Sequence, residues 1–350
     1  MLYMAMQNSF YFALCMCLWY YIFRNIKGAY AMQKFRWAYI GNGSIANSTA
    51  REIVKGNHII TSVYGRNSEK ANAFAEKYGA QVYNDLDSAV NRDDVDAVYI
   101  ATPHTAHVNY AVRAMERGKP VLCEKPVGVS VKDVDTLIHT AEKTNTYFCE
   151  AMWTWFSGVA LTVKKWVKNN EIGKIKSVVI NYAFPGILMP KNSRVLMPET
   201  AGGALLDIGI YPITYCYNLF GYPKNIKCKG KLKDGIDISE KVILEYDDFY
   251  CTLNMSLCRV KENCIIKGDR GTISLPVFFH MASKAILKNE KGKQVFNGKT
   301  DYLTEFNLVS EEIREGRKES AYIPFSATRD CMKIMDECRT QMGLVYPFEK

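Results

Sequence analysis

The sequence predicts an α/β fold with two domains: a doubly wound parallel sheet, followed by an α/β domain whose large sheet is mostly antiparallel. Two patterns predict this fold. Apolar runs alternate with helix-like segments over residues 34–153, and short runs with period-two alternation follow within residues 154–350. At 350 residues the chain is long enough to build two cores. We therefore expect one domain over residues 34–153 and a second over residues 154–350.

The first turn of the first domain has the composition of a phosphate-binding loop. A buried strand at Phe35–Ile40 runs directly into the sequence GNGSIA, and a helix-like segment and a second strand, His58–Gly65, follow. In this frame the first glycine allows a tight turn, the second lets a pyrophosphate approach the backbone, and the alanine keeps the helix close to the sheet. The helix start adds free N–H groups and a positive dipole end. The turn predicts a Rossmann-type dinucleotide site with contacts from Gly41, Gly43, Ser44, Ile45 and Ala46.

The end of the second strand bears on the choice of cofactor. NAD-binding domains usually place Asp or Glu there to hold the ribose 2′-hydroxyl. This chain has Gly65 followed by Arg66, which leaves room for a 2′-phosphate that the arginine can bind through charge-assisted hydrogen bonds. Asn67 and Ser68 can add donors. We expect NADP to be preferred over NAD; the alternative is that Arg66 is only a solvated turn residue.

Two further strands end in side chains suited to a ligand site. The apolar run Val95–Pro103 predicts a central strand, and the run before Lys125 predicts another. Ligands of a doubly wound sheet bind at the carboxyl ends of its strands. A lone lysine is usually a solvated surface residue, but at this edge Lys125 would lie beside a nicotinamide ring. The residues predicted to contact the cofactor from these strand ends are Thr102, Pro103, His104, His107, Glu124 and Lys125.

His104 and His107 are three residues apart at a helix start, a spacing that two metal ligands can have. No acidic or sulfur-containing side chain stands near them in the sequence. A helix cap or a contact to the cofactor is the better interpretation, and we predict no metal site.

The segment Glu199–Gly221 begins near a pair of glycines and becomes helical. Asp207 and Tyr211 are four residues apart, so both side chains lie on one face of that helix. Asp207 could also be no more than an N-cap. Because a proline in a helix interior loses a hydrogen bond and clashes, Pro212 must lie early in the helix or kink it. The strand-like runs in residues 174–275 predict a sheet with one exposed face, which a partner subunit or the chain's own helices could cover.

Five segments together resemble the Gfo/Idh/MocA oxidoreductases: Gly41–Ala46, Arg66, Ala101–His107, Glu124–Pro126 and Gly202–Tyr211. The resemblance covers about residues 34–340. The sequence AMWTWF at Ala151–Phe156 and the tyrosine of the last motif are most similar to the dimeric dihydrodiol dehydrogenase branch. The resemblance implies a Rossmann domain, a second domain for substrate binding and dimerisation, NADP, a carbohydrate or diol substrate, and a homodimer or homotetramer. That branch usually has an arginine where this chain has Trp155, so a positive charge is lost here.

The resemblance implies hydride transfer between a nicotinamide and a secondary alcohol or ketone of a sugar, polyol or cyclic diol. The alcohol must also lose a proton, and Tyr211 is the candidate acceptor, with its pKa lowered by the Lys125 ammonium. Lys125 would stabilise the developing charge on the substrate oxygen; direct proton transfer by Lys125 is the competing assignment. Asp207 would orient the substrate or the lysine. Trp153 and Trp155 would wall the substrate pocket, unless they belong to the core.

Two other functions stay open at this point. An NAD-dependent glycosidase of the same fold oxidises its substrate transiently to cleave a glycosidic bond. A non-catalytic NAD(P)-binding regulatory protein would use the fold without any turnover. Lys125 together with Asp207 and Tyr211 favours an enzyme, and net turnover of the cofactor would separate a dehydrogenase from a glycosidase.

Charge and cysteine usage exclude some partners. The net charge of +9 is spread along the chain without a dense basic cluster, so we expect no binding of nucleic acid. The 11 cysteines show no Cys-x-x-Cys pair and no metal-ligand spacing. This usage is typical of free thiols in a reducing cytoplasm.

Residues 1–33 form an apolar extension whose run Phe10–Phe23 is 14 residues long and uncharged. A membrane span needs about 20 apolar residues. A signal peptide would begin with positive charge and end in small residues, and this segment does neither. Because Met32 stands just before the first strand, we expect a mis-assigned start or a dispensable extension, with a weak membrane anchor as the alternative.

Overall fold

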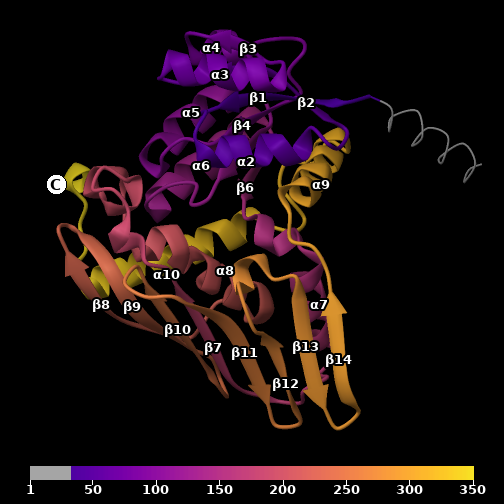
Figure 1. Cartoon of the computed structure of the whole chain (residues 1–350), viewed down its shortest axis with the longest axis vertical. Helices are drawn as coiled ribbons and strands as arrows, with labels where there is room; N and C mark the ends of the chain where they lie inside the picture. Colours follow the sequence, from indigo (N-terminus) through magenta and orange to yellow (C-terminus); the bar gives the residue numbers. More distant parts are fainter. Residues whose placement is uncertain (1–32) are drawn as a thin grey trace, which may run out of the picture.

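Two sheets organise the part of the chain that the computed structural model describes, residues 33–350 (Figure 1). The predicted apolar extension lies outside these residues, except for residue 33. The first sheet belongs to the N-terminal part of the chain, and the second lies at the other end of the molecule.

The first sheet has six parallel strands in the order β3-β2-β1-β4-β5-β6. These strands are β1 (Phe35–Ile40), β2 (His58–Tyr64), β3 (Gln81–Tyr83), β4 (Ala97–Ile100), β5 (Val121–Glu124) and β6 (Phe148–Ala151). Every residue of β4, β5 and β6 is buried, which explains why these strands are so apolar in sequence. The order reverses between β1 and β4, the point where doubly wound sheets bind ligands. The predicted parallel sheet is confirmed.

Five helices connect the strands of this sheet: α2 (Ser44–Ile53), α3 (Ser68–Tyr78), α4 (Leu86–Val90), α5 (His104–Glu116) and α6 (Val131–Thr144). Asn67 caps the start of α3, because its side-chain oxygen accepts from the N–H of Lys70 at 2.8 Å. Helix α3 therefore begins directly after Arg66 and Asn67.

The second sheet has eight strands in the order β14-β13-β12-β11-β7-β10-β9-β8. They are β7 (Ile175–Ala183), β8 (Asn225–Lys233), β9 (Ile236–Glu245), β10 (Tyr250–Ser256), β11 (Lys261–Gly268), β12 (Gly271–Leu275), β13 (Lys284–Asn289) and β14 (Gly292–Asn297). β7 and β10 pair in parallel, and every other pairing is antiparallel, as predicted. The sequence did not predict β13 and β14.

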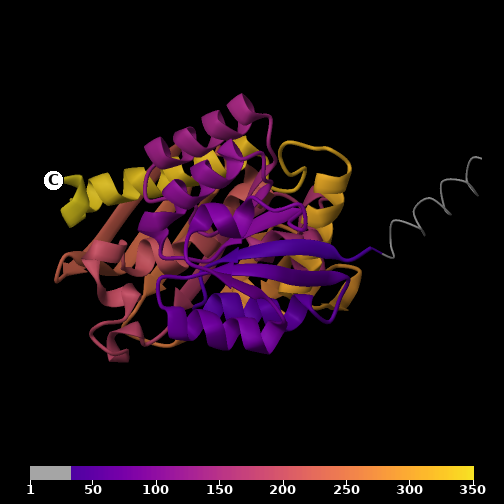
Figure 2. The ribbon, with the colours of Figure 1, turned by 90° about the horizontal axis from the view of Figure 1, so that it is seen from above.

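Helices α7 (Gly158–Lys168), α8 (Ile210–Phe220) and α10 (Phe325–Met342) cover one face of the second sheet (Figure 1). Seen from above, α10 runs below the helices of the first domain toward the C-terminus (Figure 2). It is tied to the start of α6, where Asp336 accepts from the N–H of Val131 at 2.8 Å and Arg339 donates to the carbonyl of Val129 at 2.7 Å. The helical layer therefore joins the two sheets.

Helix α9 (Tyr302–Arg314) follows the second sheet in sequence but packs on the first domain, beside α2 (Figure 1). Phe306 is fully buried, with its ring centroid 4.8 Å from that of Trp37 and 5.0 Å from that of Tyr99. The N–H of Tyr302 donates to Glu52 at 2.9 Å. The boundary predicted at residue 153 is therefore crossed by a later helix.

No helix within residues 33–350 is both long enough and apolar enough to span a bilayer.

Candidate active site

A cavity of about 370 Å³ opens at the carboxyl ends of β1, β4 and β5 and reaches the second sheet. Its size is within the usual range for small-molecule sites. The predicted site residues that line it are Ser44, Ile45, Thr102, His104, Glu124, Lys125, Trp153, Asp207 and Tyr211. The structure thus brings the candidate phosphate loop, Lys125 and the Asp207 to Tyr211 segment to one place.

The glycine turn after β1 leaves space for a ligand against the backbone. Gly41 has φ +109°, and a Cβ there would lie 2.3 Å from the carbonyl oxygen of Ala101, so only glycine fits. Gly43 is the N-cap of α2 without a side-chain capping bond, and a Cβ on it would meet nothing within 4 Å. Ala46 is fully buried. The first N–H groups of α2 are therefore available to a phosphate, as the sequence predicts.

Arg66 is exposed directly after β2, outside the cavity but at the same edge of the sheet. The preceding Gly65 lies against Asn42, since a Cβ on it would lie 2.4 Å from the Asn42 amide nitrogen. Arg66 therefore does not line the cavity, and its contact with a 2′-phosphate stays a prediction.

Lys125 follows the end of β5 and lines the cavity. Its ammonium donates to the backbone carbonyl of Asp207 at 2.8 Å and lies 3.9 Å from the carboxylate of the same residue. It also lies over the ring of Tyr211, 4.5 Å from the centroid. Burial lowers the pKa of Lys125, and the charge of Asp207 opposes this shift.

A wide helical turn presents the Asp207 carbonyl to the lysine. Residues Leu205–Gly209 form a π-helical segment directly before α8. In such a turn a carbonyl pairs with the N–H five residues later. For Asp207 that residue is Pro212, which has no N–H, and the Lys125 ammonium donates to the carbonyl instead. The irregularity expected at Pro212 thus takes the form of this turn, with the proline in the first turn of α8.

Arg194 is a site residue that the sequence analysis missed. It comes from the short helical turn η3 (Arg194–Leu196), and its guanidinium donates to the Asp207 carboxylate at 2.7 Å. A Cβ on Gly202 would lie 2.6 Å from the Arg194 carbonyl oxygen, so this glycine lets the turn pack closely. Burial raises the pKa of Asp207, but Lys125 and Arg194 outweigh it and hold the pKa below its usual value.

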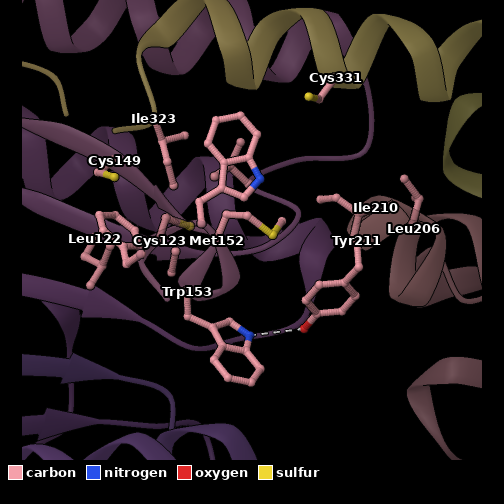
Figure 3. Close-up of a cluster of buried hydrophobic side chains, with 14 of the residues drawn as sticks. Leu122, Cys123, Cys149, Met152, Trp153, Leu206, Ile210, Tyr211, Ile323 and Cys331 are labelled. Atoms are coloured by element: carbon pink, nitrogen blue, oxygen red, sulfur yellow. Dashed lines mark hydrogen bonds between the residues drawn. The ribbon is translucent and has the colours of Figure 1, made fainter. Parts of the chain in front are cut away.

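Tyr211 lies on the first turn of α8, almost fully buried. The indole N–H of Trp153 donates to its hydroxyl at 3.4 Å (Figure 3). Burial raises the pKa of Tyr211 well above its usual value, with a smaller opposing effect from Trp153. The prediction that Lys125 lowers this pKa is wrong, because the ammonium lies over the face of the ring rather than beside the phenol oxygen.

The two histidines at the start of α5 have different environments. His104 lines the cavity, with Nε2 3.3 Å from the guanidinium of Arg194. His107 lies behind it and bridges two backbone carbonyls, those of Thr102 at 2.7 Å and Pro126 at 2.8 Å. Burial lowers the pKa of His107 to about 4, and the two carbonyl contacts oppose this shift. The ring joins the loops after β4 and β5. Within residues 33–350, no three His, Cys, Asp or Glu side chains are grouped so that they could hold a metal.

Glu124 faces the sheet beneath the lysine. Its carboxylate accepts from the hydroxyl of Tyr99 at 2.5 Å. Burial raises the pKa of Glu124, and the bond from Tyr99 partly offsets this shift. The predicted contact residue Pro103 is the N-cap of α5 and does not line the cavity.

Comparison with known proteins shows the family of the chain. A profile of the oxidoreductase family with an NAD-binding Rossmann fold matches residues 35–151, and a GFO/IDH/MocA C-terminal domain profile matches residues 160–274. The scyllo-inositol 2-dehydrogenase (NADP(+)) IolU of Bacillus subtilis is 32% identical over 83% of this chain and 92% of its own length. The chain belongs to the Gfo/Idh/MocA oxidoreductase family.

Other relatives and solved structures agree with this family assignment. Trans-1,2-dihydrobenzene-1,2-diol dehydrogenase of Xenopus laevis is 27% identical over 89% of this chain and 99% of its own. The aldose-aldose oxidoreductase of Caulobacter crescentus has a TM-score of 0.80 at 19% identity, over 88% of this chain and 97% of that one. KijD10, a 3-ketoreductase of Actinomadura kijaniata, has a TM-score of 0.79 at 19% identity, over 89% and 98%. The solved structures support the fold, and the resemblance to the dihydrodiol dehydrogenase branch is confirmed.

Trp155, where that branch of the Gfo/Idh/MocA family usually has an arginine, does not line the cavity. Its ring stacks on that of Tyr217, with centroids 6.4 Å apart and planes 12° apart, and it is buried. Its large apolar surface accounts for this burial. The structure therefore corrects its predicted place in the pocket wall, which only Trp153 of the pair occupies.

The second sheet supplies cavity residues that no motif in the sequence indicated. Tyr182 and Phe184, at and just after the end of β7, line the cavity opposite the strand ends of the first domain. Nothing in the local sequence distinguishes them from core residues, because the last four residues of β7 are all buried. Tyr182 and Phe184 become site residues because the second domain packs against the strand ends of the first.

Proposed function

We propose that this chain is an NADP-preferring dehydrogenase or reductase that acts on a secondary alcohol or ketone of a sugar, polyol or cyclic diol. The observation that carries the proposal is Lys125, held by Asp207 above the ring of Tyr211 in a cavity beside the glycine turn. The printed names of the relatives, an inositol dehydrogenase that uses NADP(+) and a set of cyclic-diol dehydrogenases, support the same substrate class.

The residues present fit a nicotinamide dinucleotide. The uncapped start of α2 and the open space at Gly43 suit a pyrophosphate. Thr102 lines the cavity with a buried hydroxyl that has no hydrogen-bond partner within residues 33–350, so it is available to a ligand. The cofactor supplies the hydride acceptor for alcohol oxidation and the hydride donor for the reverse reaction.

The directions of the two pKa shifts favour Lys125 over Tyr211 as the group that accepts the proton. Burial lowers the pKa of Lys125, which brings it closer to neutral pH. Burial raises the pKa of Tyr211, which takes it further from neutral pH. Lys125 is therefore the better proton acceptor, and Tyr211 stays a phenol that can donate to the substrate oxygen. During oxidation the substrate carbon loses hydride, its hydroxyl proton passes to the Lys125 amine, and the resulting ammonium returns the proton in the reverse direction. Asp207 is a positioning residue that holds the lysine.

Replacing Arg66 by alanine should weaken the binding of NADPH by roughly 10- to 100-fold and leave NADH binding nearly unchanged, since hydrogen bonds to a charged group contribute about 1.5–3 kcal/mol. Fluorescence titration of the full chain with each nucleotide measures both affinities. Arg51→Ala, which removes an exposed arginine from the last turn of α2, is the matched control. Equal losses for both nucleotides would contradict the assignment of Arg66 to the 2′-phosphate.

The proposal includes a dimer formed through the uncovered face of the second sheet. A register row across that face contains four half-buried apolar residues, Ile243, Val179, Ile265 and Ile286, and continues into Val295 on β14. Thr252 and Ser274 complete the row between these residues. Half-buried apolar side chains on an uncovered sheet face suit contact with a second copy of the chain. The nine cysteines of residues 33–350 are all free thiols, which supports a location in the reducing cytoplasm.

Placing a charge in the middle of that row should dissociate the dimer. Ile265→Glu would bury a carboxylate at the interface, and we expect the sedimentation coefficient to fall from that of a dimer to that of a monomer. Lys132→Glu on the exposed side of α6 is the control. A wild-type chain that sediments as a monomer at micromolar concentration would refute the dimer.

A further inference from the structure

One acidic side chain of the second sheet reaches the segment that carries Asp207. Asp237, near the start of β9, is fully buried, and its Oδ2 accepts from the backbone N–H of Leu205 at 2.6 Å. Leu205 is the first residue of the π-helical segment Leu205–Gly209, and the first N–H groups of a helix have no acceptor within it. The residue before it is Ala204, whose side chain cannot cap a helix. Asp237 therefore caps this segment from a strand 32 residues further along the chain.

A glycine before the segment makes room for this carboxyl group. Gly203 has φ +122°, and a Cβ on it would overlap Oδ1 of Asp237. Its N–H donates to the carbonyl of Val195 at 2.9 Å, within the short turn η3 that also supplies Arg194. A side chain at position 203 would push either Asp237 or this turn out of place. The contact between Asp237 and Leu205 is thus part of the same packing that brings Arg194 to the cavity.

The segment transmits this contact to the reacting groups. Asp207, two residues after Leu205, accepts from the Lys125 ammonium at 2.8 Å through its carbonyl and from Arg194 at 2.7 Å through its carboxylate. Both bonds depend on where the segment begins, because Leu205 and Asp207 belong to one helical turn. A displacement of about 1 Å would break the contact with Lys125, and a misplacement of that size can lower a rate by about 10²-fold.

We propose that Asp237 is a positioning residue of the active site: by holding the N–H of Leu205, it keeps Asp207 in contact with Lys125 and Arg194. The inference rests on the proposed function, in which Lys125 accepts the substrate proton.

The role holds for either protonation state of Asp237. Burial raises the pKa of Asp237 and that of the neighbouring Glu240. A carboxylate, a carboxylic acid and an amide all have an oxygen that can accept from the N–H of Leu205. An asparagine amide should therefore replace the carboxyl group in this contact.

The test is steady-state oxidation of a panel of polyols and cyclic diols by the full chain with NADP+. Asp237→Ala should lower kcat for the best substrate by roughly 10- to 100-fold, while NADPH affinity from fluorescence titration should stay within about twofold of wild type, because the start of α2 is untouched. Asp237→Asn should keep kcat within about threefold of wild type, since it retains the acceptor. Asp248→Ala, at an exposed position between β9 and β10, is the control and should match wild type.

The pH profile of kcat separates positioning from a simple loss of folded protein. Burial lowers the pKa of Lys125, and the charge of Asp207 opposes this shift. If Asp237→Ala lets Asp207 move away, the pKa of Lys125 falls further, so kcat for oxidation should rise at lower pH than in wild type. A variant that is only less stable would keep the wild-type profile, as Asp237→Asn should. The other charged groups that act on this pKa are the same in every variant: Arg194, Glu124 and Glu150.

Three results would overturn the inference: an unchanged kcat in Asp237→Ala, a lower kcat without a shifted profile, or an Asp237→Asn variant as impaired as Asp237→Ala. If Asp237→Ala does not fold, Asp237→Ser takes its place, because its shorter side chain also leaves the N–H of Leu205 without its acceptor. A wild-type chain that binds NADPH but oxidises no member of the panel would instead overturn the proposed function.

Discussion

Lys125→Ala is expected to lower kcat for the oxidation of a polyol or cyclic diol by about 10²- to 10⁴-fold, the usual loss when a positioned acid–base group is removed. NADPH binding should stay close to the wild-type affinity, because the phosphate contacts lie at the start of α2. The loss of kcat is expected because the Lys125 ammonium lies between Asp207 and Tyr211, and no other amine lines the cavity within residues 33–350. Steady-state NADPH formation and fluorescence titration measure the two quantities.

The pH dependence separates Lys125 from Tyr211 as the proton acceptor. Oxidation needs the neutral amine, so kcat should rise with pH through the Lys125 pKa, which burial places below the usual value of about 10.4. Reduction needs the ammonium, so its rate should fall over the same range. Lys132→Ala, at an exposed position, should keep both profiles. A basic limb that survives in Lys125→Ala would assign the proton transfer to Tyr211 instead.

The sequence was most informative where function depends on local backbone geometry. Gly41 is needed for a tight turn, and Gly43 leaves the backbone open to a ligand. A short motif is enough to predict both features. The apolar runs of β4 and β5 likewise predict buried parallel strands, since burial on both faces removes any alternation. The first sheet and its ligand edge could therefore be predicted without coordinates.

Features that depend on contacts between distant segments could not be predicted. Arg194 reaches Asp207 only because a glycine lets its turn pack closely, and His280 meets Tyr182 through a loop between two strands. The wrong prediction that Lys125 lowers the pKa of Tyr211 also concerns a contact between distant segments. The family resemblance implied that Lys125 and Tyr211 would meet, but not that the ammonium would lie over the face of the ring.

Helix α9 also depends on contacts between distant segments, and a substitution at Phe306 tests how much it stabilises the first domain. We expect Phe306→Ala to lower the free energy of unfolding by about 3–5 kcal/mol, the usual cost of truncating a fully buried phenylalanine. The side chain has no exposed surface and packs on Trp37 of β1 and Tyr99 of β4, so its loss leaves a cavity in the first domain. Urea unfolding followed by circular dichroism measures the change.

The controls for Phe306 test whether residues beyond 300 complete the core of the first domain. Phe306→Leu fills part of the cavity and should cost clearly less than the alanine variant. Phe278→Ala removes a side chain that is 56% exposed and should change stability by no more than about 0.5 kcal/mol. A similarly small effect of Phe306→Ala would mean that the first domain is stable without α9. A large effect means that the nucleotide-binding sheet is completed by a helix from the far end of the sequence, so a fragment ending near residue 153 should fold poorly.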